Sequence, residues 1–362
     1  FPVAAPGLLG KLPRYALNRD KAIRVDYGSL LAVMPWLLAF IRRCNETSWR
    51  AAAAALDPLC AAAYDEHMRV AGAIGARDLI IRRGWMKLYR SEEAFAASAA
   101  EREILTEYRI SHEIIDGAEL PQFEPALRRR FAKAVWHTET GSVLDPGALV
   151  QAYEAAARAQ GATFVAARAT QVVEDGQGAR VLLEGGGAVP ATTVVIATGA
   201  ASDDLTRAMG YRFPLAAERG YHRHFADAGE HRLSRPIHDT GGGYVIAPMN
   251  AGLRLLSGVE LARRNAPANL AQIDAVEQEA RQTVSVGAAV EPGPWHGSRP
   301  STPDGLPVIG RAPRHTNVVF AFGHGHIGLS TGPITGRVVA ELIAGAPTAI
   351  PIAPFAPDRF RP

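Results

Sequence analysis

Gly323-His324-Gly325-His326-Ile327-Gly328 lies between an apolar run, residues 318–322, and a run with helical spacing, residues 331–344. The six residues fit the pattern G-x-G-x-x-G, in which the backbone approaches a pyrophosphate at a helix N-terminus. A dinucleotide site of this kind also needs a second strand that ends in an acidic residue about 20 positions later. Glu341 falls inside the helix instead, and Gly345 then ends the helix. We therefore interpret the turn as the last strand-to-helix joint of a sheet rather than as an NAD site.

The bulk composition is that of an ordinary globular chain. Its 362 residues, 48% hydrophobic and 21% charged, can bury a large core and predict two domains. The net charge is only +3, and the basic residues are scattered apart from Arg128-Arg129-Arg130, so we do not expect nucleic-acid binding. The two cysteines, Cys44 and Cys60, are too few for a disulfide framework and favour a reducing cytoplasm.

One apolar stretch has two interpretations. Residues 30–41 are too few to span a bilayer, and Arg42-Arg43 follows them directly. The stretch therefore predicts a buried helix. Because an apolar helix that contains Trp36 and ends in basic residues also suits a membrane surface, peripheral association with the inner membrane is the alternative.

Apolar spacing and turn residues predict the remaining elements. Asp145-Pro146 supplies an N-cap and a first-turn proline for a helix that runs to Ala159. Short β-rich runs after residue 162 then indicate an α/β sheet with a small antiparallel insertion, so the fold class is α/β (α+β overall). We expect helices at residues 46–75, 91–109 and 266–284, strands at 131–143, 163–166, 170–174, 180–183 and 192–197, and an antiparallel sheet at 214–260. The buried strand before Thr198 and Gly199 ends where backbone can approach a ligand.

Three segments resemble the FAD-dependent amino-acid oxidoreductases of the D-amino-acid oxidase and glycine oxidase superfamily, most closely the bacterial D-amino-acid dehydrogenases. They are Asp145-Pro146 with its helix, residues 194–199, and residues 297–328, which begin Gly-Ser-Arg-Pro-Ser-Thr-Pro-Asp-Gly. The last segment is the most specific. The resemblance implies an FAD-binding Rossmann-like domain and a substrate domain with a mixed or antiparallel sheet and helices. We assign residues 1–27, 141–213 and 296–362 to the first domain, and residues 28–140 and 214–295 to the second.

The start of the chain departs from the family pattern. Family members begin with a strand, a G-x-G-x-x-G turn, a helix and a second strand that ends in Glu or Asp, which together hold much of the FAD. A βαβ unit needs about 30 residues, and nothing before Gly7 can serve as its first strand. We therefore expect an N-terminally truncated sequence that has lost most of its FAD affinity. A noncatalytic subunit or binding module is the alternative from another class.

The resemblance also implies a substrate site. Arg299 matches the family position that grips the substrate carboxylate, a role that suits the planar guanidinium. Tyr221 and His222 stand on a strand where relatives place pocket residues, and alternation lets only one of them face the ligand easily. Tyr244, after three glycines, is a lid or wall candidate. His324 is expected near the flavin ring or the substrate.

The cofactor residues follow in the same way. The N–H groups of Gly328, Leu329 and Ser330 at the helix N-terminus are expected to face the flavin and stabilise its reduced, anionic form. Gly325 and Gly328 are small enough for the ring to lie against backbone, and Val173 is expected beside the adenine. Thr198 and Gly199 complete the set. Because no cysteine follows Cys60, we expect noncovalent FAD, and His-x-His pairs without a matching carboxylate do not predict a metal site.

The resemblance therefore implies a flavoenzyme that oxidises a D-amino acid by hydride transfer to FAD. A cyclic substrate such as D-proline or hydroxyproline is a specific expectation. The electrons are expected to pass to a quinone or carrier protein. A glycine or sarcosine oxidase that uses oxygen is the close alternative.

Overall fold

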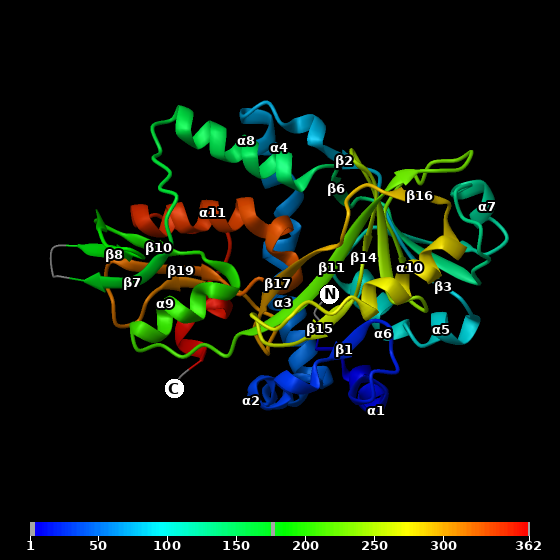
Figure 1. The fold of residues 1–362 in the computed structure, drawn as a ribbon, viewed down its shortest axis with the longest axis horizontal. Coiled ribbons are helices and arrows are strands. Elements are labelled where there is room, and N and C mark those ends of the chain that lie inside the picture. Colours follow the sequence, from blue (N-terminus) through cyan, green and yellow to red (C-terminus); the bar gives the residue numbers. More distant parts are fainter. Residues whose placement is uncertain (1–3, 175–177, 361–362) are drawn as a thin grey trace.

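The computed structural model describes residues 4–174 and 178–360, so Phe1, the first residue of the expected truncated start, lies outside the described residues. The described part contains an 11-stranded sheet, called the large sheet, a three-stranded sheet, called the small sheet, and two further sheets of two and three strands. Figure 1 shows the small sheet on the left, between α8 and α11 above and α9 below, and the large sheet on the right. The helices are α1 (Leu12–Ala16), α2 (Leu30–Arg43), α3 (Glu46–Ala61), α4 (Ala63–Ala73), α5 (Glu92–Ala96), α6 (Ala99–Glu107), α7 (Leu120–Phe123), α8 (Pro146–Ala159), α9 (Ser202–Ala208), α10 (Ala271–Thr283) and α11 (Gly328–Ala344).

The large sheet is mostly antiparallel, as the run of residues 214–260 predicts. Its order is β1-β15-β11-β14-β13-β12-β3-β5-β4, with β16 and β17 also paired to β11. Two neighbours are parallel, β1 to β15 and β12 to β3. The strands are β1 (Ile23–Val25), β3 (Trp85–Tyr89), β4 (His112–Asp116), β5 (Lys133–His137), β11 (Ala216–Asp227), β12 (Ile237–Asp239), β13 (Tyr244–Met249), β14 (Gly252–Leu256), β15 (Val259–Leu261), β16 (Val286–Ala289) and β17 (Trp295–Ser301).

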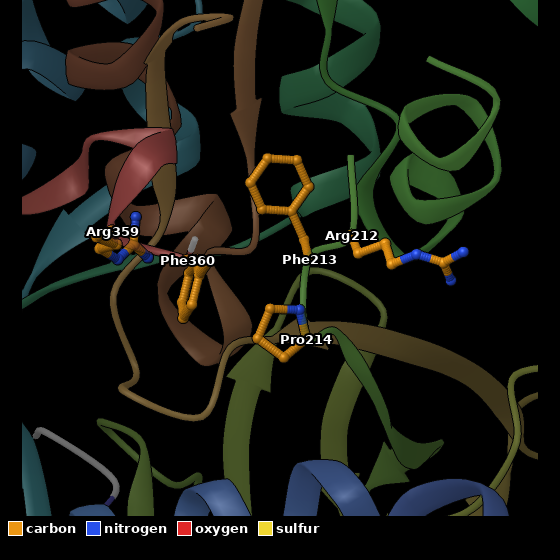
Figure 2. Close-up of a pocket in the computed structure, with 5 residues that line it drawn as sticks. All are labelled: Arg212, Phe213, Pro214, Arg359 and Phe360. Atoms are coloured by element: carbon orange, nitrogen blue, oxygen red, sulfur yellow. The ribbon is translucent and has the colours of Figure 1, made fainter. Parts of the chain in front are cut away.

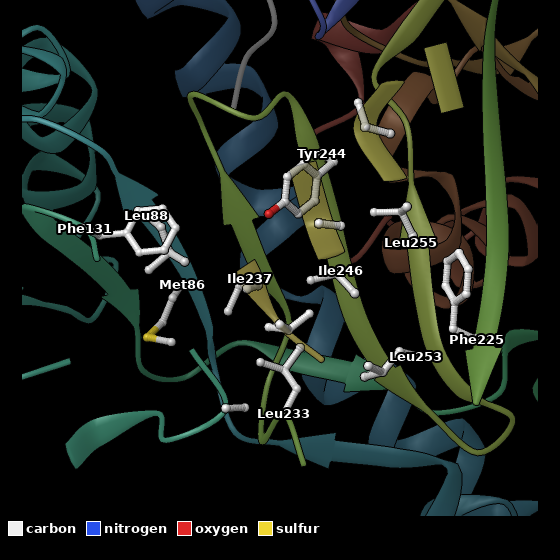
Figure 3. Close-up of a cluster of buried hydrophobic side chains, with 14 of the residues drawn as sticks. Met86, Leu88, Phe131, Phe225, Leu233, Ile237, Tyr244, Ile246, Leu253 and Leu255 are labelled. Carbon is white, nitrogen blue, oxygen red and sulfur yellow. The ribbon is translucent and has the colours of Figure 1, made fainter. Parts of the chain in front are cut away.

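One face of the large sheet carries the main hydrophobic core. Because side chains alternate along a strand, Tyr221 and Phe225 of β11 share this face, where Ile273 and Val276 of α10 pack against the strands. Figure 3 shows part of this cluster, including Tyr244. The opposite face of β11 carries Glu218, Gly220, His222 and His224, so a single strand separates a packed apolar layer from a polar one.

The small sheet is built by the two runs that the sequence marks as buried strands. β10 (Val194–Ile196) pairs in parallel with β19 (Val318–Phe322), and β18 (Val308–Arg311) pairs antiparallel on the other side of β19. The expected antiparallel insertion is β7 (Ala169–Glu174), β8 (Ala179–Leu183) and β9 (Ala188–Ala191). A further short pair joins β2 (Ile80–Arg82) to β6 (Gly141–Val143).

The strand expected at residues 163–166 is wrong. This segment has no regular structure, and Phe164 and Val165 are 44% and 56% exposed. Its β-branched and aromatic residues have strand propensity, but a strand needs a hydrogen-bonded neighbour. In the described residues β10 is an edge strand with β19 as its partner, and the 163–166 segment pairs with neither.

The helix predicted after Asp145-Pro146 is confirmed. The Asp145 carboxylate accepts a hydrogen bond of 2.9 Å from the N–H of Ala148, which satisfies one of the free first-turn donors of α8. The helices expected at 46–75 and 91–109 are each present as two shorter helices, α3 with α4 and α5 with α6. Gly345 closes α11 in the left-handed conformation, at φ 69°.

Helix α2 is a surface helix, not the buried one that its composition predicts. Val33 and Trp36 are its buried side chains, whereas Leu31 is 91% and Leu38 47% exposed. The side of α2 that faces the protein is fixed because the Trp36 indole N–H donates to the Ser301 carbonyl oxygen at 2.8 Å. A run of apolar residues does not reveal how many sides a helix will bury.

Two strands cross the expected division into domains. We assigned residues 1–27 and 296–362 to the FAD-binding part, yet β1 pairs with β15 and β17 pairs with β11, both in the large sheet, whereas β18 and β19 lie in the small sheet. Val25 packs with Trp36, Ala216 and Leu261, which explains the position of β1. The rest of the expected division stays a prediction.

Candidate functional site

The site forms where the polar face of β11 meets the glycine turn. Strand β17 pairs with β11 in a register that sets Glu218 opposite Arg299, Gly220 opposite Gly297 and His222 opposite Trp295. Directly opposed residues point to the same face of the sheet. The turn follows β19 and contains the short helix η5 (Gly325–Ile327), which contacts β17. Residues from two sheets therefore meet at the end of β17.

The opposed glycines make a floor without side chains. A Cβ added to Gly220 would lie 2.5 Å from the Arg299 guanidinium nitrogens, and one added to Gly297 would lie 2.3 Å from the Trp295 ring. Arg299 and Trp295 therefore both fold over this floor. A cation and a flat aromatic ring lie next to each other there.

Arg299 is held ready for an anion. Its Nη1 atom is buried and has no hydrogen-bond partner in the described structure. Burial lowers the pKa of Arg299, while the negative charge of Glu218 acts in the opposite direction. A guanidinium keeps its charge under these conditions, so a buried donor without an acceptor remains. Such a donor is costly unless a ligand supplies the acceptor.

The two histidines of the turn are neutral and differently placed. His324 Nε2 lies 3.1 Å from the Thr335 hydroxyl, and burial lowers its pKa to about 4. His326 Nδ1 lies 3.4 Å from Glu218 Oε2, and burial together with Arg299 lowers its pKa to about 3. His326 therefore faces the same space as Arg299, whereas His324 is tied to α11.

The first turn of α11 keeps free backbone donors. Its N-cap residue, Ile327, makes no side-chain cap, so the N–H groups of this turn remain open to an acceptor. The glycines of the turn need their lack of a side chain, because Gly323 and Gly325 have φ of 80° and 52°. At Gly325 an added Cβ would also lie 3.3 Å from the Ser301 hydroxyl.

The position of α11 depends on a contact from α4. Leu329 is four residues before Pro333, which has no N–H to donate to the Leu329 carbonyl oxygen. His67 Nε2 lies 2.8 Å from this oxygen and so supplies the missing donor, while the Tyr153 hydroxyl lies 3.2 Å from His67 Nδ1. The backbone of Leu329 is thereby fixed although its side chain is 41% exposed.

Comparison with known proteins agrees with this geometry. Residues 27–342 match the DAO family, described as FAD dependent oxidoreductase. The chain belongs to this family of FAD-dependent oxidoreductases. Its expected fold class and enzyme class are thereby confirmed.

Relatives of this DAO-family chain carry both oxidase and dehydrogenase names. A D-amino-acid oxidase from Bradyrhizobium diazoefficiens is 32% identical over 99% of this chain and 86% of the relative. A D-amino acid dehydrogenase from Rhizorhabdus wittichii is 25% identical over 99% and 87%. D-amino acid dehydrogenase 2 from Pseudomonas aeruginosa is 28% identical over 96% and 84%.

Solved structures share the fold. Glycine oxidase from Geobacillus kaustophilus has a TM-score of 0.76 at 23% identity, covering 85% of this chain and 84% of its own. L-proline dehydrogenase from P. horikoshii has a TM-score of 0.72 at 17% identity, covering 84% and 82%.

The residues present in this DAO-family chain fit the flavin end of FAD. The uncapped first turn of α11 offers donors, and Cβ atoms added to Gly332 and Gly336 would meet no atom within 4 Å, so that side of the helix is open. The short helix η4 (Gly199–Ala201), which begins at the end of β10, contacts β17. Thr198 there lies 3.1 Å from the Ser202 hydroxyl. Val173 lies farther along, in the β7-β8-β9 sheet.

The structure brings together only part of the predicted substrate site. Arg299 and His222 share the polar face of the large sheet, and His324 lies at its edge, where its backbone bridges to Ser301. Tyr221 lies on the opposite face, where its hydroxyl donates to Glu260 at 2.6 Å. Tyr244 is also in that core, 1% exposed.

Three polar residues at the site were not predicted from the sequence. Glu218 and His326 interact electrostatically with Arg299, and Ser301 lies beside Glu218. Glu218 and Ser301 were not singled out, and His326 was considered but not predicted as a site residue. The sequence did hold a signal for Glu218. It lies two positions before Gly220 and four before His222 on one strand, so the three residues share a face. No sequence signal indicates that β17 pairs with β11 in the register that sets Arg299 beside it.

Two surface hollows lie elsewhere. One, of about 400 Å³, is lined by Arg212, Phe213, Pro214, Arg359 and Phe360 (Figure 2). The other, of about 590 Å³, lies beside α6 and β4. Neither includes Arg299 or the glycine turn. Groups of three or more His, Cys, Asp or Glu placed to hold a metal are absent from residues 4–174 and 178–360.

Proposed function

We propose that this chain oxidises a D-amino acid at its α-carbon, with FAD as the immediate oxidant. The observation that carries the proposal is Arg299, whose buried Nη1 has no partner and whose guanidinium lies over Gly220, beside the glycine turn. The guanidinium would hold the substrate carboxylate with two parallel hydrogen bonds. The D configuration rests on the names of the relatives.

The chain's residues supply orientation. With its carboxylate on Arg299, a substrate lies between the polar face of β11 and the turn. FAD, when bound, accepts the α-hydrogen as hydride. The free N–H groups of Gly328, Leu329 and Ser330 stabilise the charge that the cofactor gains, because they lie at the positive end of α11. We propose that the rest of the FAD molecule contacts Val173, Thr198 and Gly199.

Noncovalent FAD is part of the proposal. Burial raises the pKa of the Cys60 thiol to about 11, and it also raises that of the Cys44 thiol. Both thiols are therefore protonated near neutral pH, and the thiolate is the nucleophilic form. Precipitation with acid should release all the yellow colour into the supernatant; colour that stays with the protein would contradict this assignment.

The site suits a cyclic substrate side chain such as that of D-proline or hydroxyproline. Trp295 lies over Gly297 and stacks on His222 with ring centres 4.8 Å apart. This flat apolar surface starts next to Arg299 and offers a ring broad contact. Farther along β11 the face is polar, since His224 lies 2.6 Å from Glu291 and accepts a 2.8 Å hydrogen bond from Arg254.

The decisive experiment mixes the flavin-loaded protein anaerobically with matched D- and L-amino acids and follows the flavin absorbance. Bleaching of the flavin by D-proline and not by L-proline supports the proposal. If neither enantiomer of any amino acid bleaches the flavin, the proposal is overturned and the noncatalytic alternative remains. Bleaching chiefly by glycine or sarcosine would favour the second candidate, an oxidase of that type.

We propose a quinone or carrier protein as the final acceptor, since two of the three relatives above are named dehydrogenases. The name of the 32% identical relative favours oxygen instead. Steady-state rates with a quinone analogue and with oxygen separate the two. Peroxide formation as fast as quinone reduction would contradict the proposed acceptor.

We further propose a cytoplasmic protein that rests on the inner membrane through α2. No helix in the described part of the chain is long and apolar enough to cross a bilayer. The exposed Leu31 and Leu38 lie on the same helix as Arg42 and Arg43, a combination that suits an anionic lipid surface. Leu31→Glu should abolish sedimentation with vesicles that contain phosphatidylglycerol. Equal sedimentation of both proteins would contradict the proposal.

A further inference from the structure

Glu218 places a buried carboxylate opposite the proposed carboxylate anchor. Glu218 of β11 and Arg299 of β17 are directly opposed, so their side chains share one face. Glu218 is 6% exposed, and its Oε2 atom, like Arg299 Nη1, has no hydrogen-bond partner in the described structure. In that part of the chain no nitrogen-to-oxygen distance within 4.0 Å joins the two side chains as an ion pair.

Two opposite charges that are buried side by side without pairing need a ligand. A buried charge without a partner is strongly destabilising, and either side chain alone could be satisfied by an ion. An α-amino acid carries a carboxylate and an ammonium on one carbon, so it can satisfy both. Gly220, the next residue on this face of β11, has no side chain, and the Arg299 guanidinium lies over it.

We propose that Glu218 binds the ammonium group of the substrate and accepts one proton from it, so that Glu218 and Arg299 form a clamp for the amino-acid zwitterion. This inference rests on the proposed function, because it assumes that the substrate is an α-amino acid. It makes Glu218 a catalytic residue, since its carboxylate touches the reacting nitrogen.

The surroundings of Glu218 suit a proton acceptor. Burial raises the pKa of its carboxyl, whereas the Ser301 hydroxyl and Arg299 act in the opposite direction. His326, the other titratable group that faces it, is a neutral ring because burial and Arg299 depress its pKa. A neutral imidazole cannot balance the carboxylate charge, so within the described residues the Glu218 carboxylate has no cationic partner.

The step balances in atoms and electrons. An N–H bond of the substrate ammonium breaks, and its proton goes to a Glu218 carboxylate oxygen, which leaves a neutral amine. The α C–H bond then breaks with its electron pair, which passes as hydride to the FAD that the proposed function supplies. The nitrogen lone pair forms the C=N bond of the iminium product. Water hydrolyses this product after release.

A binding experiment isolates the ammonium contact from chemistry. The probes are 2-aminoisobutyrate, which has no α-hydrogen to lose, and 2,2-dimethylpropanoate, in which a methyl group replaces the amine. In the flavin-loaded protein, calorimetry should show that Glu218→Gln weakens the first probe about 10- to 100-fold, the range of a hydrogen bond to a charged group. The second probe should bind equally or more tightly, because no carboxylate opposes it.

The matched control is Glu260→Gln. Glu260 is also buried, at 1% exposure, but it lies on the other face of the sheet and receives the Tyr221 hydroxyl. This variant should keep the wild-type affinity for both probes. Weakening of both probes to the same degree in Glu218→Gln would show general damage to the site and overturn the clamp.

The rate of anaerobic flavin reduction tests the proton transfer. For Glu218→Gln we expect a loss of about 10²- to 10⁴-fold at neutral pH, the usual effect of removing a general base. The loss should shrink as the pH rises and the substrate amine becomes neutral in solution. A deficit that stays constant with pH would overturn the proton role. Glu218→Asp, which keeps the charge, should lose less and supplies the same test if the Gln variant does not fold.

The two levels of failure are distinguishable. If wild-type protein binds neither probe and no amino acid bleaches its flavin, the proposed function fails. If wild-type protein is bleached by D-amino acids and Glu218→Gln behaves identically, the function stands and the clamp fails.

Discussion

At the scale of single residues, the site depends on one guanidinium held over a floor that lacks side chains. The Nη1 atom of Arg299 is buried and has no hydrogen-bond partner in the described structure, a state in which the guanidinium strongly favours an anion. The guanidinium lies over Gly220, and the Trp295 ring lies over the opposed Gly297. Two substitutions test this arrangement.

Arg299→Ala should raise the Michaelis constant for the amino acid about 10- to 100-fold while FAD stays bound. The expected size is that of a charge-assisted hydrogen bond. Arg299→Lys should recover part of the affinity, because a lysine supplies the charge without the bidentate geometry. Steady-state kinetics and the flavin spectrum measure both effects. Loss of the yellow colour in the alanine variant would show that Arg299 serves the cofactor.

Gly220→Ala should act on substrate affinity without unfolding the protein. The added Cβ would lie 2.5 Å from the Arg299 guanidinium, which is the flexible end of a side chain and can move aside. The Michaelis constant should therefore rise while the melting temperature stays near that of the wild type. Gly293→Ala is the control, since its Cβ would meet no atom within 4 Å. Equal kinetics in the two variants would contradict the proposed position of Arg299.

At the scale of elements, the N-terminus of α11 depends on a partner helix. Pro333 leaves the Leu329 carbonyl without its helical donor, and His67 of α4 provides one at 2.8 Å. The turn that precedes α11 also carries His324 and His326. Movement of this helix end would therefore disturb both the N–H groups proposed to contact the flavin and the space beside Arg299.

His67→Ala should lower the free energy of unfolding by about 1–3 kcal/mol, the cost of a buried acceptor left without a donor. It should also weaken FAD binding. Tyr153→Phe removes only the 3.2 Å contact between the Tyr153 hydroxyl and His67 Nδ1. It should therefore lower the free energy of unfolding by less than His67→Ala does. Urea unfolding and a flavin titration measure the two quantities. If His67→Ala lowers stability but leaves the FAD affinity unchanged, the contact between α4 and α11 does not contribute to cofactor binding.

At the scale of the whole molecule, an ionic cluster joins distant segments around Glu279 of α10. The Glu279 carboxylate receives hydrogen bonds from Lys21, which precedes β1, from Arg90, which follows β3, and from Arg129. These contacts, that of Lys21 first, lower its pKa to about 2 from an ordinary value of 4.5. A carboxyl whose pKa is depressed on folding stabilises the protein above its unfolded pKa.

The stability contributed by Glu279 should therefore be complete above about pH 4.5 and disappear as the pH falls toward 2. Glu279→Gln should melt at a lower temperature than wild type at pH 7, and the difference should narrow on acidification through this window. Glu230→Gln, at an exposed position, is the control and should melt like the wild type throughout. A difference that is independent of pH would contradict an ionic origin.

Local signals in the sequence determined much of the fold. The Asp145 cap, the Gly345 stop and the strand-turn-helix around Gly323 each depend on residues within a few positions, so their chemistry can be read directly. The segment from Gly297 to Gly328 also carried the family resemblance, and with it the expectation of FAD and of Arg299. The strand expected at residues 163–166 failed because a strand requires a partner that local residues do not specify.

Only the tertiary structure decided which polar residues meet. The pairing of β17 with β11 sets Glu218 beside Arg299, and alternation then sends Tyr221 to the opposite, packed face. A shift of that register by one residue would exchange the two faces. Register is fixed by apolar burial over the whole sheet, which involves residues from β1 to β17. The sequence alone therefore determined the chemistry to expect, and long-range strand pairing determined the side chains that carry it.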